Sequence, residues 1–137
     1  MKTILADTAP LVALFDRSEP THKSIVDFIK SFKGEIITSW PVATEVTHLL
    51  DFSVQAQIDF LSWINRGGII INQIKMTELE TIIKMMLKYS DRPMDLADAS
   101  LVLLGHQLNI TEIITLDSDF QIYRLPNKKK FINLLNY

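Results

Sequence analysis

The sequence predicts an α/β fold in which helices cover both faces of a mainly parallel sheet of four to five strands. Short β-branched runs alternate along the chain with longer segments whose apolar residues recur at helical spacing. Such alternation favours parallel strands joined by right-handed helical crossovers. The length of 137 residues, with 47% hydrophobic and 22% charged residues, fits a single globular domain spanning residues 1–137.

The N-terminal part of the chain predicts one strand followed by two helices. Residues 2–6 form a short apolar run that ends at Asp7, and after a turn the apolar run 11–15 opens a helix. A second helix is expected over 21–33, where apolar residues recur at helical spacing. Gly34 stands where a glycine commonly ends a helix.

The middle of the chain continues the alternation. Residues 35–38 are strand-like, and Pro41 suits the first turn of the next helix, which carries Glu45. An amphipathic helix over 54–65 stops at two consecutive glycines. The β-branched run 69–71 then predicts a buried strand.

The C-terminal part predicts two helices and two further strands. A helix over 77–89 is followed by a helix over 94–108 that is apolar around nearly its whole circumference. A helix of that kind is expected to be buried. A strand over 112–115 ends just before Asp117, and a last short strand is expected near 130–134.

The buried helix contains the most informative polar residues of the chain. Asp95 and Asp98 stand three positions apart at its start. Asp95 suits a helix N-terminus, where the helix dipole favours an acidic side chain. A buried Asp98 carboxylate, however, costs several kcal/mol unless something compensates its charge. A divalent cation is the candidate that would do so.

Other acidic residues fall at one edge of the expected sheet. Asp7 and Asp117 each follow a strand, Glu45 lies on the helix after the second strand, and Asp98 lies on the helix that leads into the fourth. Ligand sites of such sheets lie at the carboxyl ends of the strands. Carboxylates that converge there repel one another unless cations bind or their pKa values rise.

An oxygen-only ligand set favours Mg²⁺ or Mn²⁺ over zinc or copper. A cation of this kind activates water and neutralises charge that builds on a phosphate. The matching reaction is hydrolysis of a phosphodiester bond, with no histidine or serine needed as nucleophile.

Charge and composition narrow the class of protein further. The net charge is −2, but six of the sixteen acidic residues belong to the proposed site and its neighbourhood, so fourteen basic residues face ten acidic ones elsewhere. This balance permits a polyanionic partner. The chain has no cysteine, which excludes thiolate chemistry and fits a reducing compartment. With no signal-peptide core and no membrane span, a cytoplasmic protein is expected.

Four acidic motifs follow one another along nearly the whole chain: Leu5-Ala6-Asp7-Thr8, Val42-Ala43-Thr44-Glu45-Val46, Asp98-Ala99-Ser100-Leu101 and Thr115-Leu116-Asp117-Ser118-Asp119-Phe120. In this order the chain resembles the PIN-domain nucleases, in particular the VapC-type toxin ribonucleases of bacterial toxin–antitoxin pairs. The resemblance implies a three-layer α/β/α fold and a Mg²⁺-dependent endoribonuclease, with Mn²⁺ able to substitute. It also implies an RNA substrate, a small antitoxin partner and a homodimer.

The same resemblance assigns roles to the acidic residues. Asp7 and Asp98 match the characteristic metal ligands, and Glu45 matches an acid that positions or deprotonates the attacking water. Asp117 matches the fourth acid, although Asp119 occupies an alternative position and the resemblance does not separate the two. We favour Asp117 as a third metal ligand because it lies nearer to the end of its strand.

Three further polar residues are expected to support the site. Asp95 lies one helical turn before Asp98 and would contact metal-bound water. Thr8 and Thr115 carry hydroxyls that would orient ligands or water. Two interpretations of Trp40 are open: its ring packs against the sheet, or it stacks on a nucleobase.

Two other functions compete with the nuclease. A PIN-like module that only binds nucleic acid or protein would have no need of the repulsion among its acids. An aspartyl-phosphate receiver would need an acidic pair after the first strand and a phosphate-accepting aspartate after the third. Here the first strand leads to Asp7 alone, and residues 69–71 lead to Asn72.

Overall fold

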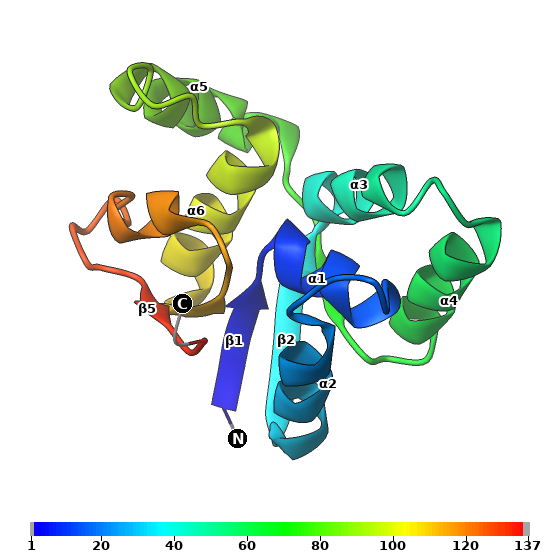
Figure 1. Cartoon of the computed structure of the whole chain (residues 1–137). Coiled ribbons are helices and arrows are strands. Elements are labelled where there is room, and N and C mark those ends of the chain that lie inside the picture. Colours follow the sequence, from blue (N-terminus) through cyan, green and yellow to red (C-terminus); the bar gives the residue numbers. More distant parts are fainter. Residues whose placement is uncertain (1, 136–137) are drawn as a thin grey trace.

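The computed structural model describes residues 2–135, which contain a five-stranded parallel sheet (Figure 1). Its strands lie in the order β3-β2-β1-β4-β5, and every pairing between neighbours is parallel. The strands are β1 (Lys2–Ala6), β2 (Gly34–Ser39), β3 (Ile70–Asn72), β4 (Glu112–Ile114) and β5 (Ile132–Asn133). The predicted parallel sheet is therefore confirmed.

Helices fill the connections between these strands. They are α1 (Thr8–Phe15), α2 (His22–Ser31), α3 (Trp40–Leu49), α4 (Val54–Asn65), α5 (Leu79–Lys88) and α6 (Leu96–Leu108), with short 3₁₀ turns η1 (Met76–Glu78) and η2 (Ser118–Gln121). The chain moves outward from β1 to β3 and then returns past β1 to β4. Because such crossovers are right-handed, the return places α5 and α6 on the face opposite α1 to α4, which gives three α/β/α layers.

The strand order creates a switch point between β1 and β4. On one side of β1 the chain continues into β2 and β3, and on the other side lie β4 and β5. All five strands run in the same direction, so their carboxyl ends share one edge. A crevice outside this point is where open α/β sheets bind ligands. The residues that follow β1 and β4 are Asp7 and, after a short turn, Asp117.

Helix α6 is the most deeply buried helix among the described residues. Its residues 97–105 are all buried, as the apolar composition of this segment predicts. Two hydroxyls fix the helix against the start of α3. The Ser100 hydroxyl donates to the carbonyl of Ala97 (2.6 Å) and lies 2.6 Å from the hydroxyl of Ser39. Ser39 in turn caps α3 by accepting from the N–H of Val42 (3.3 Å).

Two expectations for the N-terminal part were wrong. Gly34 does not end a helix, because α2 ends at Ser31 and Gly34 is the first residue of β2. A Cβ atom at this position would collide with the carbonyl oxygen of Lys2, so the close pairing of β1 and β2 requires a glycine. Helix α1 begins at Thr8 rather than after Pro10, which is compatible with proline because the first turn needs no N–H donor from it.

The strand β3 is less buried than the sequence indicated. It is an edge strand, and Ile70 is 37% exposed. Ile69, which precedes the strand, carries the burial instead. A β-branched run marks a strand but does not tell an edge strand from a central one. No helix within residues 2–135 is both long and apolar enough to cross a membrane.

Candidate active site

Asp7 is held at the end of β1 by the neighbouring strand. Its backbone N–H donates to the carbonyl of Ile114 (3.0 Å), which continues the pairing of β1 with β4 by one residue. The side chain is only 4% exposed. Burial raises the pKa of Asp7 to about 6, and the charges of Asp117 and Glu45 act in the same direction.

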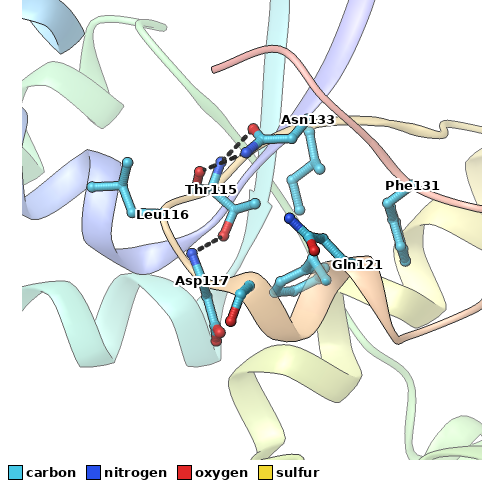
Figure 2. Close-up of a pocket in the computed structure, with 9 residues that line it drawn as sticks. Thr115, Leu116, Asp117, Gln121, Phe131 and Asn133 are labelled. Carbon is cyan, nitrogen blue, oxygen red and sulfur yellow. Dashed lines mark hydrogen bonds between the residues drawn. The ribbon is translucent and has the colours of Figure 1, made fainter. Parts of the chain in front are cut away.

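Thr115 connects the ends of the two central strands. Its hydroxyl donates to Oδ2 of Asp7 (2.8 Å) and accepts from the backbone N–H of Asp117 (3.0 Å). The backbone of Thr115 is clamped in turn by the side-chain amide of Asn133, which accepts from its N–H (3.2 Å) and donates to its carbonyl (3.0 Å), as Figure 2 shows. Asn133 thus substitutes for a strand pairing beyond the end of β5.

Asp117 caps the turn η2, and this separates it from Asp119. One carboxylate oxygen of Asp117 accepts from the backbone N–H of Asp119 (2.9 Å). The side chain of Asp119 points to Arg92 instead and forms an ion pair of 2.9 Å. Asp117 borders a cavity of about 330 Å³ that residues of η2 also line. Figure 2 shows the side chains around it.

Asp98 reaches the site from the first turn of α6. It is 9% exposed, and its Oδ2 accepts from the hydroxyl of the fully buried Tyr123 (3.0 Å). Burial raises the pKa of Asp98 to about 8, with further contributions from the charges of Asp7 and Asp95. Burial and the charge of Asp98 also raise the pKa of Tyr123, so its hydroxyl is a proton donor at neutral pH.

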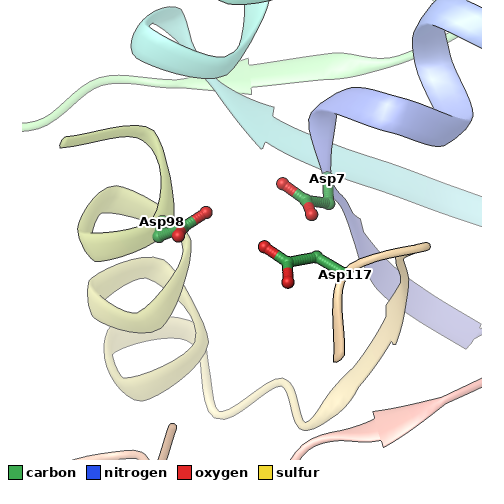
Figure 3. A group of neighbouring side chains, drawn as sticks. All are labelled: Asp7, Asp98 and Asp117. Carbon is green, nitrogen blue, oxygen red and sulfur yellow. The ribbon is translucent and has the colours of Figure 1, made fainter. Parts of the chain in front are cut away.

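These three carboxylates converge on one point. Asp7, Asp98 and Asp117 each offer an oxygen, and the three oxygens lie within 4.8 Å of one another. Figure 3 shows the side chains turned toward a common centre from β1, α6 and the segment after β4. Residues that are far apart in the sequence therefore form one acidic cluster at the switch point of the sheet.

Glu45 and Asp95 lie beside this cluster rather than in it. Glu45, on α3, is half-buried and contributes to the raised pKa of Asp7. Asp95 is the N-cap of α6 and accepts from the backbone N–H of Asp98 (2.8 Å). Its side chain therefore has the capping role that its position at a helix start also predicts.

The residues present fit a divalent cation. Three converging carboxylates supply hard oxygen ligands at a spacing that a cation can bridge. Without one, the burial that raises the pKa values of Asp7 and Asp98 is left uncompensated. The hydroxyl oxygen of Thr8, next to Asp7, is buried without a hydrogen-bond partner among the described residues, as a site completed by an ion and its water would leave it.

The chain is similar in sequence to a known ribonuclease. No family model matches the chain. Over 116 residues the chain is 28% identical to Ribonuclease VapC26 of Mycobacterium tuberculosis, which covers 83% of this chain and 86% of the relative.

Solved structures carry the likeness further. VapC20 of Mycobacterium tuberculosis, described as a Sarcin-Ricin loop cleaving toxin, superposes with a TM-score of 0.79 at 17% identity, covering 87% of this chain and 93% of its own. The chain has the PIN-domain fold of the VapC proteins. A chain of VapBC2 from Rickettsia felis, solved bound to a DNA fragment from their promoter, superposes with a TM-score of 0.63 at 12% identity and covers 96% and 98%.

Two residues that hold the site in place within this VapC-type fold were not predicted from the sequence. Tyr123 donates to Asp98 across 25 positions, and Asn133 clamps Thr115 across 18 positions. Nothing local in the sequence marks a tyrosine or asparagine as a partner of a distant residue. Trp40, for which packing against the sheet and stacking on a base were both open, is 50% exposed and lines a groove together with Glu45 and Asp95.

Proposed function

We propose that this chain is a metal-dependent endoribonuclease that uses Mg²⁺, with Mn²⁺ able to replace it. The observation that carries the proposal is the convergence of Asp7, Asp98 and Asp117 within 4.8 Å at the switch point of the sheet. The likeness to Ribonuclease VapC26 and the fold shared with VapC20, described as a Sarcin-Ricin loop cleaving toxin, support RNA as the substrate. No thiolate is available, and the described part of the chain offers no second cluster of three or more acidic or histidine ligands.

The chemistry follows from what each residue is placed to do. A bound dication supplies a lowered pKa for water and neutralises charge on the phosphate. Asp7, Asp98 and Asp117 would hold it, and Thr115 and Tyr123 keep two of these carboxylates in fixed orientation.

Glu45 would accept the proton of the attacking water. It is half-buried, it interacts electrostatically with Asp7, and none of its carboxylate oxygens is engaged in a hydrogen bond within residues 2–135. A carboxylate that is free to accept a proton near the cluster meets the first requirement of a general base.

The biological setting is part of the same proposal. The likeness to VapC20 and to a chain of the VapBC2 complex supports a toxin of a toxin–antitoxin pair, held by a small antitoxin protein. A homodimer that acts on RNA in the cytoplasm completes this picture. We also propose that residues 1–137 form a single domain. The match with the two solved structures supports this, because it covers nearly the whole length of each.

Replacement of one carboxylate tests the proposal directly. Asp98→Asn keeps the shape of the side chain but removes a charged ligand, so we expect RNA cleavage in Mg²⁺ to fall by about a thousandfold or more. Circular dichroism and thermal melting should show an intact fold. Asp27→Asn, which neutralises an exposed aspartate on α2, should cleave like the wild type.

The alternatives predict other outcomes. Full cleavage by Asp98→Asn would exclude the assigned role of Asp98. If the wild type fails to cleave any RNA yet is stabilised by Mn²⁺, the chain is a binding module with a metal site. Covalent labelling by acetyl phosphate would instead indicate an aspartyl-phosphate protein.

A further inference from the structure

Trp40 is placed in an unusual way for the first residue of a helix. It begins α3, directly after the N-cap Ser39, and half of its side chain is exposed to solvent. Trp63, the second tryptophan of the chain, is half-buried and packs against the ring of Phe15 with centroids 5.6 Å apart. Unlike Trp63, Trp40 therefore leaves part of its indole ring open to solvent.

This indole forms one wall of a groove of about 620 Å³ between α3 and the start of α6. The lining of the groove is mostly apolar and includes two carboxylates, those of Glu45 and Asp95. Trp40 from α3 and Leu96 from the start of α6 are 50% and 47% exposed, so both helices contribute exposed apolar surface to the groove.

The groove lies beside the acidic cluster, because two of its lining residues interact with members of the cluster. Asp95 is bonded to the backbone N–H of Asp98, and Glu45 interacts electrostatically with Asp7. Two of the residues that line the groove therefore flank two of the three carboxylates that would hold the metal. A substrate whose phosphate lies at the cluster would have its neighbouring groups at the mouth of this groove.

We propose that the groove is a nucleobase subsite, in which a base next to the scissile phosphate of a single-stranded RNA stacks on Trp40. This inference rests on the proposed ribonuclease activity and deepens it by naming the recognition of the substrate. Stacking of a base on an aromatic side chain tolerates any sequence, because every base has a π-face. An extended single strand is required, because a base inside a duplex is already stacked.

The two carboxylates that line the groove favour a nucleobase over other occupants. The carboxylates of Glu45 and Asp95 repel a phosphate but can accept hydrogen bonds from the amino and imino groups of a base edge. An apolar helix would bury both carboxylates without supplying a cation in return, which is costly. A nucleobase fits both parts of this lining, because its aromatic ring can pack against the apolar side chains and its N–H groups can donate to the carboxylates.

Fluorescence and binding of the full chain test this proposal. In an Asp98→Asn background, which prevents cleavage, Trp63→Phe leaves Trp40 as the only tryptophan. Titration with a short single-stranded RNA of mixed sequence should quench its fluorescence in a saturable way. The same titration with an abasic oligonucleotide should quench it far less.

Binding of fluorescently labelled RNA supplies the second measurement, again with Asp98→Asn but with Trp63 retained. Trp40→Ala should weaken RNA binding by about 5- to 150-fold, the range found when a stacking residue is truncated. Trp40→Phe should retain most of the affinity because it keeps a stacking ring. Phe52→Ala, which removes another exposed aromatic ring away from the groove, should bind like its parent.

Each remaining outcome decides between the proposals. Equal quenching by abasic RNA, or unchanged affinity of Trp40→Ala, overturns the nucleobase subsite even if the acidic cluster cleaves RNA. If Trp40→Ala instead dissociates a dimer in light scattering and leaves RNA affinity unchanged, a second copy occupies the groove. If the cluster fails to cleave RNA while Trp40 reports base stacking, the subsite holds and the nuclease activity does not.

Discussion

Two hydroxyl groups determine how the acidic carboxylates are presented. Thr115 donates to Asp7 at 2.8 Å, and Tyr123 donates to Asp98 at 3.0 Å. Each bond holds one carboxylate oxygen in a fixed orientation. Partners of this kind orient metal ligands and tune their basicity, so they matter for affinity although they do not touch the ion.

Removal of the Tyr123 hydroxyl should therefore weaken the metal site without dismantling it. Tyr123→Phe keeps the buried ring and its edge-to-face contact with Tyr89, whose centroid lies 5.1 Å away. We expect the affinity for Mn²⁺, measured by electron paramagnetic resonance, to fall by about 10- to 100-fold.

Tyr89→Phe provides a matched control for this change. Tyr89 is also buried, but its hydroxyl accepts from the backbone N–H of Arg124 and does not reach the acids. This variant should lose some stability and bind Mn²⁺ as the wild type does. An equal loss of Mn²⁺ affinity in both variants would show that Tyr123 acts through packing alone.

At this scale the sequence predicted which carboxylates lie together better than it predicted the residues that hold them. The clustering of Asp7 and Asp98 and the choice of Asp117 over Asp119 followed from positions relative to strand ends. The hydrogen bond of Tyr123 and the exposure of Trp40 did not, because both depend on the tertiary path of distant segments. Whether these aspartates bind metal remains a prediction that the variants above would test.

Helix α6 shows how one element serves both the core and the site. Its segment 97–105 is buried throughout and apolar except at Asp98 and Ser100, while its first turn places Asp98 at the cluster. Asp95 makes this possible by capping the N-terminus, since its side chain accepts from the N–H of Asp98 itself. Loss of the cap would therefore loosen the turn that carries the metal ligand.

Two substitutions of Asp95 separate its cap from its charge. Asp95→Ala removes the cap and should lower the free energy of unfolding by about 1 kcal/mol. Asp95→Asn retains a capping oxygen and should unfold at nearly the same urea concentration as the wild type. If Asp95→Asn loses as much stability as Asp95→Ala, the negative charge and not the hydrogen bond supports the helix.

Element boundaries were predictable where local chemistry determines them. Helix α4 has the expected bounds Val54–Asn65, and Pro41 lies in the first turn of α3 as expected. Gly34 was misread, because a glycine after a helix and a glycine at a tight strand pairing look the same in a sequence. The edge position of β3 also depended on sheet order, which no local pattern contains.

The whole molecule contributes through the order of its strands. With β1 and β4 side by side at the switch point, the residues that follow them must lie close together. The alternation of strands and helices predicted parallel pairing and hence a shared carboxyl edge. It did not predict which strands are neighbours. The acidic residues could therefore be placed at one edge of the sheet, but the distances between them could not be predicted.

The same convergence should make the stability of the metal-free protein fall as pH rises. Asp7 and Asp98 have pKa values raised from 3.8 to about 6 and about 8 in the folded chain. Between about pH 4 and pH 8 the folded state therefore holds protons that the unfolded state has lost, and each step upward in pH favours unfolding. The contribution is complete below about pH 4, and its loss by pH 8 is on the order of several kcal/mol.

A bound dication should reverse this trend, because it replaces the protons and neutralises the ionised carboxylates. At about a hundred times its dissociation constant, Mn²⁺ would add about 2.7 kcal/mol to the free energy of unfolding. Urea unfolding at several pH values, in a chelator and in Mn²⁺, measures both effects. The gap between the two curves should widen from about pH 5 to pH 8. Asp98→Asn, which removes one of the two titrating groups, should flatten the chelator curve and narrow the gap; a metal-free wild type that grows more stable over this range would contradict the convergence of charges on which the site depends.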